Sequence, residues 1–443
     1  MSQPIEAFRN SFKIPELRQR IIFTLVMVAV YRLGAHVPTP GVDGQALAQV
    51  IGEMGGLLTF YDMFSGGAFA NATIFALGIM PYISASIIMS LLVAVIPALE
   101  TLQKAGAEGQ KKITEYTRYG TIGLCIVQSI MVASFLKQLN AGDTPILMSQ
   151  GFGFYFMCVV SFTTGTAFIM WLGEQISEFG LGNGMSLIIF ASIISSMPGA
   201  TITVVNLLQQ GDLNFFKVGV MIIVFVLVVG GIILVTVGQR RVPVQYPRQV
   251  KGRHVTAGGR NYLPLRVNQA GVIPIIFASS LLMIPSMIGS SINVPFIQKI
   301  FNDWFAYGTA PYGAAFAVLI IFFSFFYTAI TFNPVEIADN MKKYGGVIMG
   351  IRPGKATADY LNKVMTRITL VGALFLVVVS ALPTLMYRAF EIYDYNIVSF
   401  FGGTSLLIMV GVALDTVKQM EQHLVMRNYE GFSKGRRIRS RRG

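Results

Sequence analysis

The sequence predicts an all-α polytopic membrane protein with ten transmembrane helices in two five-helix inverted-repeat halves and a short re-entrant half-helix. Of its 443 residues, 53% are hydrophobic and only 12% are charged, whereas roughly 25% are charged in ordinary soluble domains. Ten apolar windows are long enough to cross a bilayer, and one apolar stretch, Tyr61–Leu92, is interrupted by polar residues and glycines. Composition therefore sets the class, and the interruption marks the stretch to examine for function.

The predicted spans each hold about 20 mostly apolar residues, the length that crosses the hydrocarbon core of a bilayer. They are 18–36, 72–96, 117–138, 152–173, 183–203, 215–237, 269–290, 311–332, 367–387 and 399–419. Before them, residues 1–20 mix basic, acidic and apolar side chains near helical spacing, which predicts an amphipathic cytoplasmic helix at the membrane surface. After them, residues 420–443 form a basic cytoplasmic tail.

The interrupted stretch divides into a short half-helix, a glycine hinge and a longer helix that starts near Ala72. Its polar and flexible positions are Asp62, Ser65, Gly66, Gly67 and Asn71. Lipid offers no hydrogen-bond partner to loose backbone, so such a break is expected only where it is buried in protein or lines a water-filled path. A pore or a substrate site is the hypothesis that follows.

Basic residues predict the orientation of the spans. All but five of the 34 Lys and Arg residues fall on one side, and short cytoplasmic loops favour these residues, so both termini are predicted to be cytoplasmic. Five spans precede the polar break at 206–214 and five follow it, so the second half enters the membrane from the opposite side. This arithmetic predicts an inverted repeat of an N-terminal half, 21–205, and a C-terminal half, 206–419.

Several functional classes are disfavoured by what the sequence lacks. The span interiors carry essentially no ionisable residue, whereas ion-coupled transporters usually place one at mid-membrane. The nearest approach to a phosphate-binding loop, Gly350–Ala356, lacks the glycine spacing and the magnesium-binding hydroxyl. The three histidines are far apart, and Cys125 and Cys158 lie in apolar runs typical of core packing. We therefore expect neither an enzyme nor a metal or other cofactor.

The loop at 238–268 is long and strongly basic, with seven basic residues and no acidic one. Alternation of Val242, Val244 and Tyr246 predicts a short β-hairpin that projects from the membrane. Topology and anionic lipid explain some of this charge. They do not explain the length, and long loops in compact proteins are usually functional. An acidic protein surface or RNA phosphate would suit such a loop.

The second long loop, 333–367, combines three local signals. Residues 335–344 have a helix-like pattern, Gly345-Gly346 predicts a turn, and Arg352-Pro353-Gly354 predicts a rigid corner. Both loops lie on the predicted cytoplasmic side, where a chain delivered by a partner would enter the membrane.

Long motifs across nearly the whole chain resemble the SecY family, the channel subunits of the bacterial Sec protein translocon. The matching runs are DMFSGGAFANATIFALGIMPYISASII, YTRYGT, WLGEQISEFGLGNGMSLIIFA, VNQAGVIPIIFASS, FNPVEIADNMKKYGGVIMGIRPG, LNKVMTR and FGGTSLLI. The resemblance implies two inverted halves around a central pore, which passes unfolded secretory polypeptides and releases hydrophobic segments into lipid through a lateral gate. It also implies the bacterial plasma membrane as the location.

The resemblance assigns residues to four parts of such a channel. The plug segment is 57–70, centred on Phe64, Ser65, Gly66 and Gly67; the apolar pore ring is Ile79, Ile83, Met185, Ile189, Ile276 and Ile408; the lateral gate is Ser84, Ser90, Asn268 and Ser279; and the docking residues are Arg240, Arg241, Lys251, Arg253, Arg352 and Lys355. Met185 departs from the isoleucine usual in the ring, and Ser90 from a longer amide found in some relatives.

The resemblance also implies partners. These are the membrane subunits SecE and SecG, the motor ATPase SecA or the ribosome at the cytoplasmic loops, an unfolded preprotein or signal peptide, and anionic lipids. A secondary transporter of a small solute, also built from inverted repeats and broken helices, is the alternative. A pore-less insertase or lipid scaffold is a third reading, and it leaves the half-helix and glycine hinge unexplained.

Overall fold

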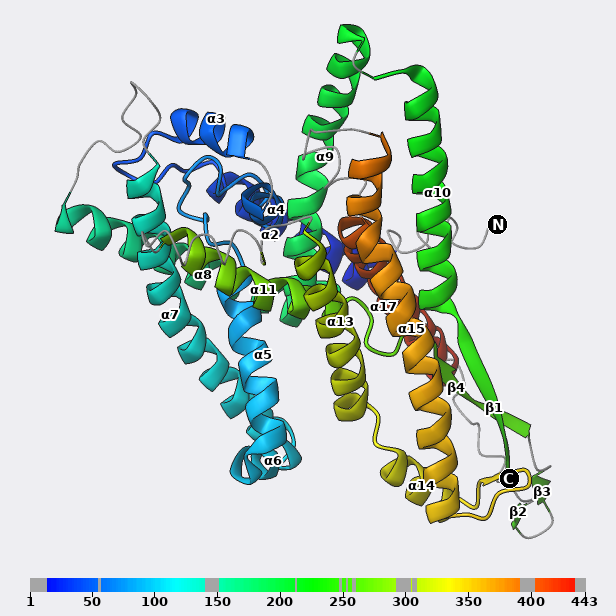
Figure 1. The fold of residues 1–443 in the computed structure, drawn as a ribbon. Coiled ribbons are helices and arrows are strands. Elements are labelled where there is room, and N and C mark those ends of the chain that lie inside the picture. Colours follow the sequence, from blue (N-terminus) through cyan, green and yellow to red (C-terminus); the bar gives the residue numbers. More distant parts are fainter. Residues whose placement is uncertain are drawn as a thin grey trace. The chain divides into compact units, whose positions relative to one another are not determined.

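The fold is described by a computed structural model, drawn as a ribbon coloured along the chain in Figure 1. By its packing contacts the chain divides into two compact units. The described residues are 14–54, 57–139, 151–211, 213–246, 249–251, 254–256, 260–291, 304, 309–390 and 403–434. Unit 1 comprises Met1–Ser86, Thr114–Ala200 and Val412–Gly443, and unit 2 comprises Ile87–Ile113 and Thr201–Gly411. This grouping follows packing contacts. It is a different division from the predicted five-helix halves, which stay a prediction.

Helices make up most of the described chain. They are α2 (Pro15–Gly34), α3 (Gly44–Met54), α4 (Leu57–Ser65), α5 (Met80–Val95), α6 (Pro97–Lys104), α7 (Ala107–Gln138), α8 (Phe152–Phe179), α9 (Gly184–Gln210), α10 (Phe215–Val237), α11 (Ile273–Ser291), α13 (Ala310–Thr331), α14 (Pro334–Lys343), α15 (Lys355–Phe390) and α17 (Gly403–Lys434). Each predicted span overlaps one of these helices.

Six helices of the described residues are long and apolar enough to cross a membrane. These are Ala107–Lys137, Phe152–Phe179, Gly184–Gln210, Phe215–Val237, Ala310–Lys343 and Lys355–Met386, and a bent pair, Met80–Val95 with Pro97–Lys104, would make a seventh. The protein is therefore a multi-pass helical membrane protein.

The second predicted span is wrong at its start. The sequence places it at 72–96, but residues before Met80 form turns and the helix α5 has 16 residues. Ala72 and Gly78 have positive φ angles, of 45° and 56°, which a right-handed helix does not accommodate. At the other end α5 bends by 100° into α6, because Pro97 holds the preceding residue, Ile96, in an extended conformation.

Both predicted terminal segments contain helix in their described parts, and their assignment as a surface helix and a cytoplasmic tail stays a prediction. Residues 15–20, assigned to a surface helix, form the first turns of α2, and residues 1–13 lie outside the described residues. At the other end α17 continues through the predicted tail as far as Lys434. One apolar cluster of unit 1 joins the start of α2, the later part of α17 and the link between α8 and α9. Its buried members are Leu17, Ile21, Leu181 and Met420.

Helix α10 shows the surface expected of a lipid-facing helix. Val226 is 61% exposed and Leu227 is 68% exposed, and both lie in a helix without a charged residue after Lys217. Exposing this apolar surface to water would cost free energy, whereas contact with the hydrocarbon of a bilayer does not. The composition of α10 is explained by lipid contact.

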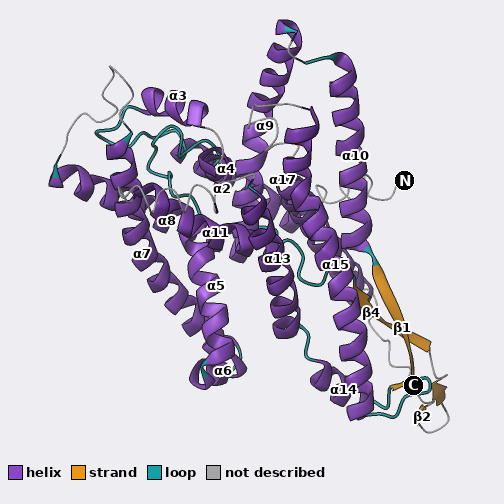
Figure 2. Ribbon diagram, viewed as in Figure 1, coloured by secondary structure: helices purple, strands orange, loops and turns teal. Residues whose placement is uncertain are grey.

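The strands of unit 2 confirm the predicted hairpin in the first basic loop (Figure 2). β1 (Gln239–Gln245) follows α10 and pairs antiparallel with β4 (Arg260–Arg266), with Val242 opposite Leu263. Two short strands, β2 (Gln249–Lys251) and β3 (His254–Thr256), form a second antiparallel pair within the same loop.

The second long loop, 333–367, adds a strand to the same sheet. β5 (Val347–Ile348) pairs with β1, so that the strand order is β4-β1-β5. The predicted helix and turn are present as α14 and the left-handed Gly345. The buried side chains of this part of unit 2 come from both loops, from α15 and from the C-cap residue of α13; they are Val242, Val244, Leu265, Phe332, Met341, Ile348, Leu361, Val364 and Met365. The two loops are therefore one folded body.

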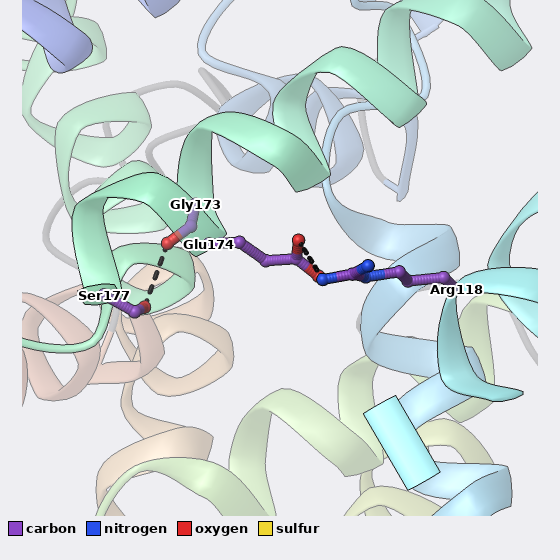
Figure 3. Close-up of polar contacts among 4 residues, drawn as sticks. All are labelled: Arg118, Gly173, Glu174 and Ser177. Carbon is purple, nitrogen blue, oxygen red and sulfur yellow. Dashed lines mark hydrogen bonds and ion pairs between the residues drawn. The ribbon is translucent and has the colours of Figure 1, made fainter. Parts of the chain in front are cut away.

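In unit 1 an ion pair joins α7 to α8 (Figure 3). Arg118 donates from Nε and Nη2 to the two carboxylate oxygens of Glu174, each at 2.7 Å. Close by, the Ser177 hydroxyl donates to the Gly173 carbonyl at 2.9 Å and accepts from the Gly184 N–H at 2.9 Å. The forked geometry of arginine fits a carboxylate with two parallel bonds, so this pair fixes α7 against α8.

Candidate functional site

The predicted break in the membrane helix is present in the structure. α4 ends at Ser65, and Gly66 and Gly67 follow with φ angles of 70° and 86°. Glycine adopts this left-handed conformation without steric cost, whereas other residues are strained in it. Phe64 and Ser65 are buried. The half-helix and the glycine hinge are therefore confirmed as local structure, and their role as a plug stays a prediction.

Hydrogen bonds within the segment hold the turn after α4 in one shape. The Asp62 carboxylate accepts from the Ala70 N–H at 2.7 Å and from the Ser65 hydroxyl at 3.3 Å. The Ser65 hydroxyl in turn accepts from the Phe69 N–H at 3.0 Å. The rings of Tyr61 and Phe69 meet edge to face with centroids 4.7 Å apart. Residues 61–70 thus form a small body with its own polar and aromatic contacts.

The chain leaves this body through a backbone anchor. The Thr39 N–H donates to the Ala72 carbonyl at 2.8 Å, and the Ile74 N–H donates to the Val37 carbonyl at 3.0 Å. Pro38 and Thr73 form an isolated antiparallel bridge. The end of the segment that faces α5 is therefore tied to residues 37–39 by main-chain bonds, independent of side-chain identity.

Two side chains outside the segment bind the turn and a third bonds to one of them, and the sequence prediction included none of the three. Tyr31 donates to the Ser65 carbonyl at 3.0 Å and lies 2.6 Å from the Ser192 hydroxyl. Arg32 donates to the Gly66 carbonyl at 2.8 Å. In the sequence the one signal is Arg32 near the outer end of an apolar span, and snorkelling of its side chain to the membrane surface explains that position equally well.

The predicted pore-ring residues are almost all buried. Five of the six are buried and Met185 is half-buried; the buried ones are Ile79, Ile83, Ile189, Ile276 and Ile408. Ile79, Ile83, Met185 and Ile189 belong to unit 1, and Ile276 and Ile408 belong to unit 2. Buried aliphatic side chains fit either a packed core or a closed apolar constriction, so the ring stays a prediction.

The unusual member of the ring, Met185, has a specific neighbour. A Cβ built on Gly173 would collide with the sulfur of Met185, so the methionine side chain occupies the space that this glycine leaves open. Gly173 lies in α8 and Met185 in the first turn of α9, both in unit 1. Methionine is unbranched and adapts to such irregular space.

The predicted gate residues lie on α5 and at α11. Ser84 is buried and Ser90 is half-buried, both on α5. The hydrogen bonds shown for the other two are local: the Asn268 amide donates to the Gly271 carbonyl at 2.9 Å, and the Ser279 hydroxyl donates to the Ile276 carbonyl at 2.9 Å. These bonds shape the start of α11, and the gate assignment stays a prediction.

The predicted docking residues are distributed over the folded loop body of unit 2. Arg240 and Arg241 on β1 and Arg352 and Lys355 before and at the start of α15 are exposed, and no carboxylate of the described residues forms an ion pair with them. Of the remaining two, the side chain of Lys251 and all of Arg253 lie outside the described residues. Four exposed cations on one folded body would suit an acidic partner.

Solved structures share this fold. One described as a protein conducting channel matches with a TM-score of 0.67 and 17% sequence identity, covering 94% of this chain and 96% of that one. Sec61 in a canine ribosome–channel complex matches with a TM-score of 0.63 and 16% identity, covering 94% of this chain and 96% of that one. The fold therefore belongs to the class of helical membrane proteins that includes protein-conducting channels.

Sequence comparison then gives the family. A family model described as SecY matches residues 73–417. The protein translocase subunit SecY of Streptomyces griseus is 47% identical, with 96% of this chain and 99% of the relative aligned. That of Escherichia coli K12 is 44% identical, over 95% of this chain and 94% of the relative. The chain belongs to the SecY family of protein translocase subunits, as its motifs predicted.

Proposed function

We propose that this translocase subunit is itself the conduit, a ten-helix channel that passes unfolded polypeptides across the bacterial plasma membrane. The observation that carries the proposal is the interrupted helix in unit 1, in which α4 and a left-handed glycine turn precede α5. Irregular backbone at membrane depth is tolerated where protein buries it or where it lines an aqueous path. Residues 57–70 would close that path as a plug.

An apolar ring suits this task because the transported chains have every kind of sequence. Aliphatic side chains can deform around any polypeptide, and when closed they exclude water and ions by dewetting. Ile79, Ile83, Met185, Ile189, Ile276 and Ile408 would form this ring. Specific recognition would instead limit transport to a few substrates.

A lateral gate would give the channel a second output. Ser84 and Ser90 of α5 and Asn268 and Ser279 at α11 would line it. A segment of about 20 apolar residues would leave through it into lipid, driven by roughly 25 cal/mol per Å² of apolar area removed from water. Polar segments would continue across the membrane, so hydrophobicity alone would sort secretion from insertion.

The exposed cations of the loop body would dock the partner that delivers the chain. The motor SecA or a ribosome would bind Arg240, Arg241, Arg352, Lys355 and their basic neighbours on the cytoplasmic side. The likeness of the fold to Sec61 of a ribosome–channel complex supports a ribosome as one such partner. SecE and SecG would be the membrane subunits beside the channel, with anionic lipid around it.

Family membership does not favour the alternative of a small-solute transporter. The SecY relatives are named as protein translocase subunits, and they align with this chain over nearly their whole length.

Site-specific photo-crosslinking tests the proposed pore. A photoreactive residue at Ile83 or Ile276, in the complete translocase with a precursor stalled in transit, should label the precursor. The matched control is the same residue at Leu227, which is an exposed apolar position on α10 and should label lipid instead. If the complex transports precursor but Ile83 and Ile276 label it no more than Leu227 does, the pore ring is wrong.

A further inference from the structure

Two side chains of α2 bind the carbonyls of one turn in unit 1, and a side chain of α9 bonds to one of the two. Tyr31 and Arg32 are consecutive on α2, and Ser192 lies on α9. Tyr31 reaches the Ser65 carbonyl at 3.0 Å, Arg32 reaches the Gly66 carbonyl at 2.8 Å, and the Ser192 hydroxyl lies 2.6 Å from the Tyr31 hydroxyl. Consecutive side chains thus bind consecutive carbonyls.

The fit around this turn is close. A Cβ on Gly66 would lie 2.9 Å from Nη1 of Arg32 and 3.1 Å from Cα of Ser192, so a larger residue would push these groups apart. Tyr31 is 1% exposed, and its ring stacks on Phe75 with centroids 5.9 Å apart. Stacking on Phe75 orients the Tyr31 ring, and the contact with Ser192 orients its hydroxyl, so the hydrogen bond to the turn is preorganised.

The contacts separate into those within the plug segment and those that leave it. Asp62 with Ala70, Ser65 with Phe69, and Tyr61 with Phe69 hold the segment's own shape. The bonds from α2 are different, because they join the segment to its surroundings. A displacement of the segment as one body would keep the first group and break the second.

We propose that Tyr31, Arg32 and Ser192 form a latch that holds the plug segment in its closed position, and that opening requires these hydrogen bonds to break. Tyr31 and Arg32 bind the turn directly. Ser192 acts through Tyr31 and is a positioning residue. While Tyr31 donates its proton to the Ser65 carbonyl, Ser192 is the donor in the 2.6 Å contact between the two hydroxyls; otherwise its proton goes to the Ile188 carbonyl of its own helix at 2.9 Å. This inference rests on the proposed plug and names what holds it.

The latch explains why main-chain carbonyls are the targets. Ser65 is the last residue of α4 and Gly66 follows it, at the end of a helix where carbonyls have no partner within the helix. A buried carbonyl without a donor is costly, so the closed position is favoured when Tyr31 and Arg32 supply donors. In the open position, water would have to hydrogen-bond the carbonyls of Ser65 and Gly66. The Tyr31 hydroxyl and the Arg32 guanidinium would each need a new acceptor.

Ion conductance of the resting translocase in planar bilayers tests the latch. Tyr31→Phe removes one donor without changing the ring, and we expect an increase in resting leak of about fivefold. Arg32→Gln replaces the charged donor by a shorter, neutral amide, and we expect about tenfold, whereas Arg32→Lys keeps a charged donor and should leak less than Arg32→Gln. Ser192→Ala should have a smaller effect in the same direction.

Matched controls lie on the same two helices. Arg20 of α2 also donates to a glycine carbonyl, that of Gly180 at 3.1 Å, so Arg20→Gln removes the same kind of bond away from the plug. The Ser196 hydroxyl of α9 donates to the Ile193 carbonyl of its own helix at 2.7 Å, so Ser196→Ala controls for Ser192→Ala. Neither control should raise the leak.

A deletion of residues 57–70 separates failure of the latch from failure of the plug. The deletion should leak, and the latch variants should add nothing to it, because both act on the same barrier. If the deletion leaks and Tyr31→Phe and Arg32→Gln do not, the latch is wrong and the plug stands. Leaks that add to that of the deletion also overturn the latch. A deletion that does not leak overturns the plug and the latch together.

Discussion

Single residues decide how closely the helices of unit 1 approach one another. Gly173 of α8 and Gly184 at the start of α9 face each other, and a Cβ on Gly184 would collide with the Gly173 carbonyl. The same glycine, Gly173, leaves the space that Met185 fills. The position of a predicted pore-ring side chain therefore depends on two glycines, and the need for glycine at both positions follows from the packing.

We predict that Gly184→Ala destabilises the purified complex by about 1–3 kcal/mol, the usual cost of overpacking a tight contact. The matched control is Gly199→Ala, on the same helix, where a Cβ meets open space. Alanine there should be neutral or stabilising, because it favours helix by up to about 1 kcal/mol over glycine. Thermal unfolding in detergent measures both, and equal melting temperatures would contradict the close approach.

Residues of the latch show what residue-level prediction misses. In the sequence, snorkelling accounts for Arg32 near the end of an apolar span, and no pattern marks Tyr31 or Ser192. Their partner is the main chain of a turn 34 positions further along from Tyr31. A main-chain carbonyl has the same chemistry in every residue, so no residue type in the sequence marks it as a partner.

At the scale of elements, the two basic loops behave as one. The sequence predicts the hairpin from alternating Val242, Val244 and Tyr246 and the helix that became α14, and the structure confirms both. It did not predict that β5 pairs with β1 or that the loops share a hydrophobic cluster. A strand of two residues, Val347–Ile348, is too short to give a periodic signal.

The exposed cations of the loop body should affect how fast a partner docks. We expect Arg352→Glu to slow motor-driven transport roughly five- to tenfold at low salt, with a smaller effect at high salt, because exposed interfacial charges act mainly on association. Lys363→Glu on α15 changes the net charge equally at another exposed position and is the control. Precursor uptake into vesicles and co-purification of the membrane subunits are the measurements. Equal loss of transport and assembly would instead indicate a structural role for Arg352.

At the scale of the whole molecule, the uneven distribution of Lys and Arg predicts orientation. Gln210, at the end of α9, should face outward, and Lys355, at the start of α15, should face the cytoplasm; both are exposed. The native Cys125 and Cys158 are free and buried, so they should give little background.

Labelling with a membrane-impermeant maleimide checks this orientation. In intact spheroplasts, Gln210→Cys should react and Lys355→Cys should not. After permeabilisation both should react. Labelling of Lys355→Cys from outside, with Gln210→Cys protected, would reverse the predicted topology and place the loop body away from any cytoplasmic motor.

The sequence by itself determined the class, the family and the approximate helices, because lipid imposes composition and length on each span separately. It also located the break at Gly66 and Gly67, since glycine and polar residues in an apolar run are local signals. Only the tertiary structure decided that α5 begins at Met80, that two loops share one sheet, and that Tyr31 and Arg32 bind the turn after α4. These features depend on contacts between distant segments, and the energy of such contacts has no local pattern in the chain.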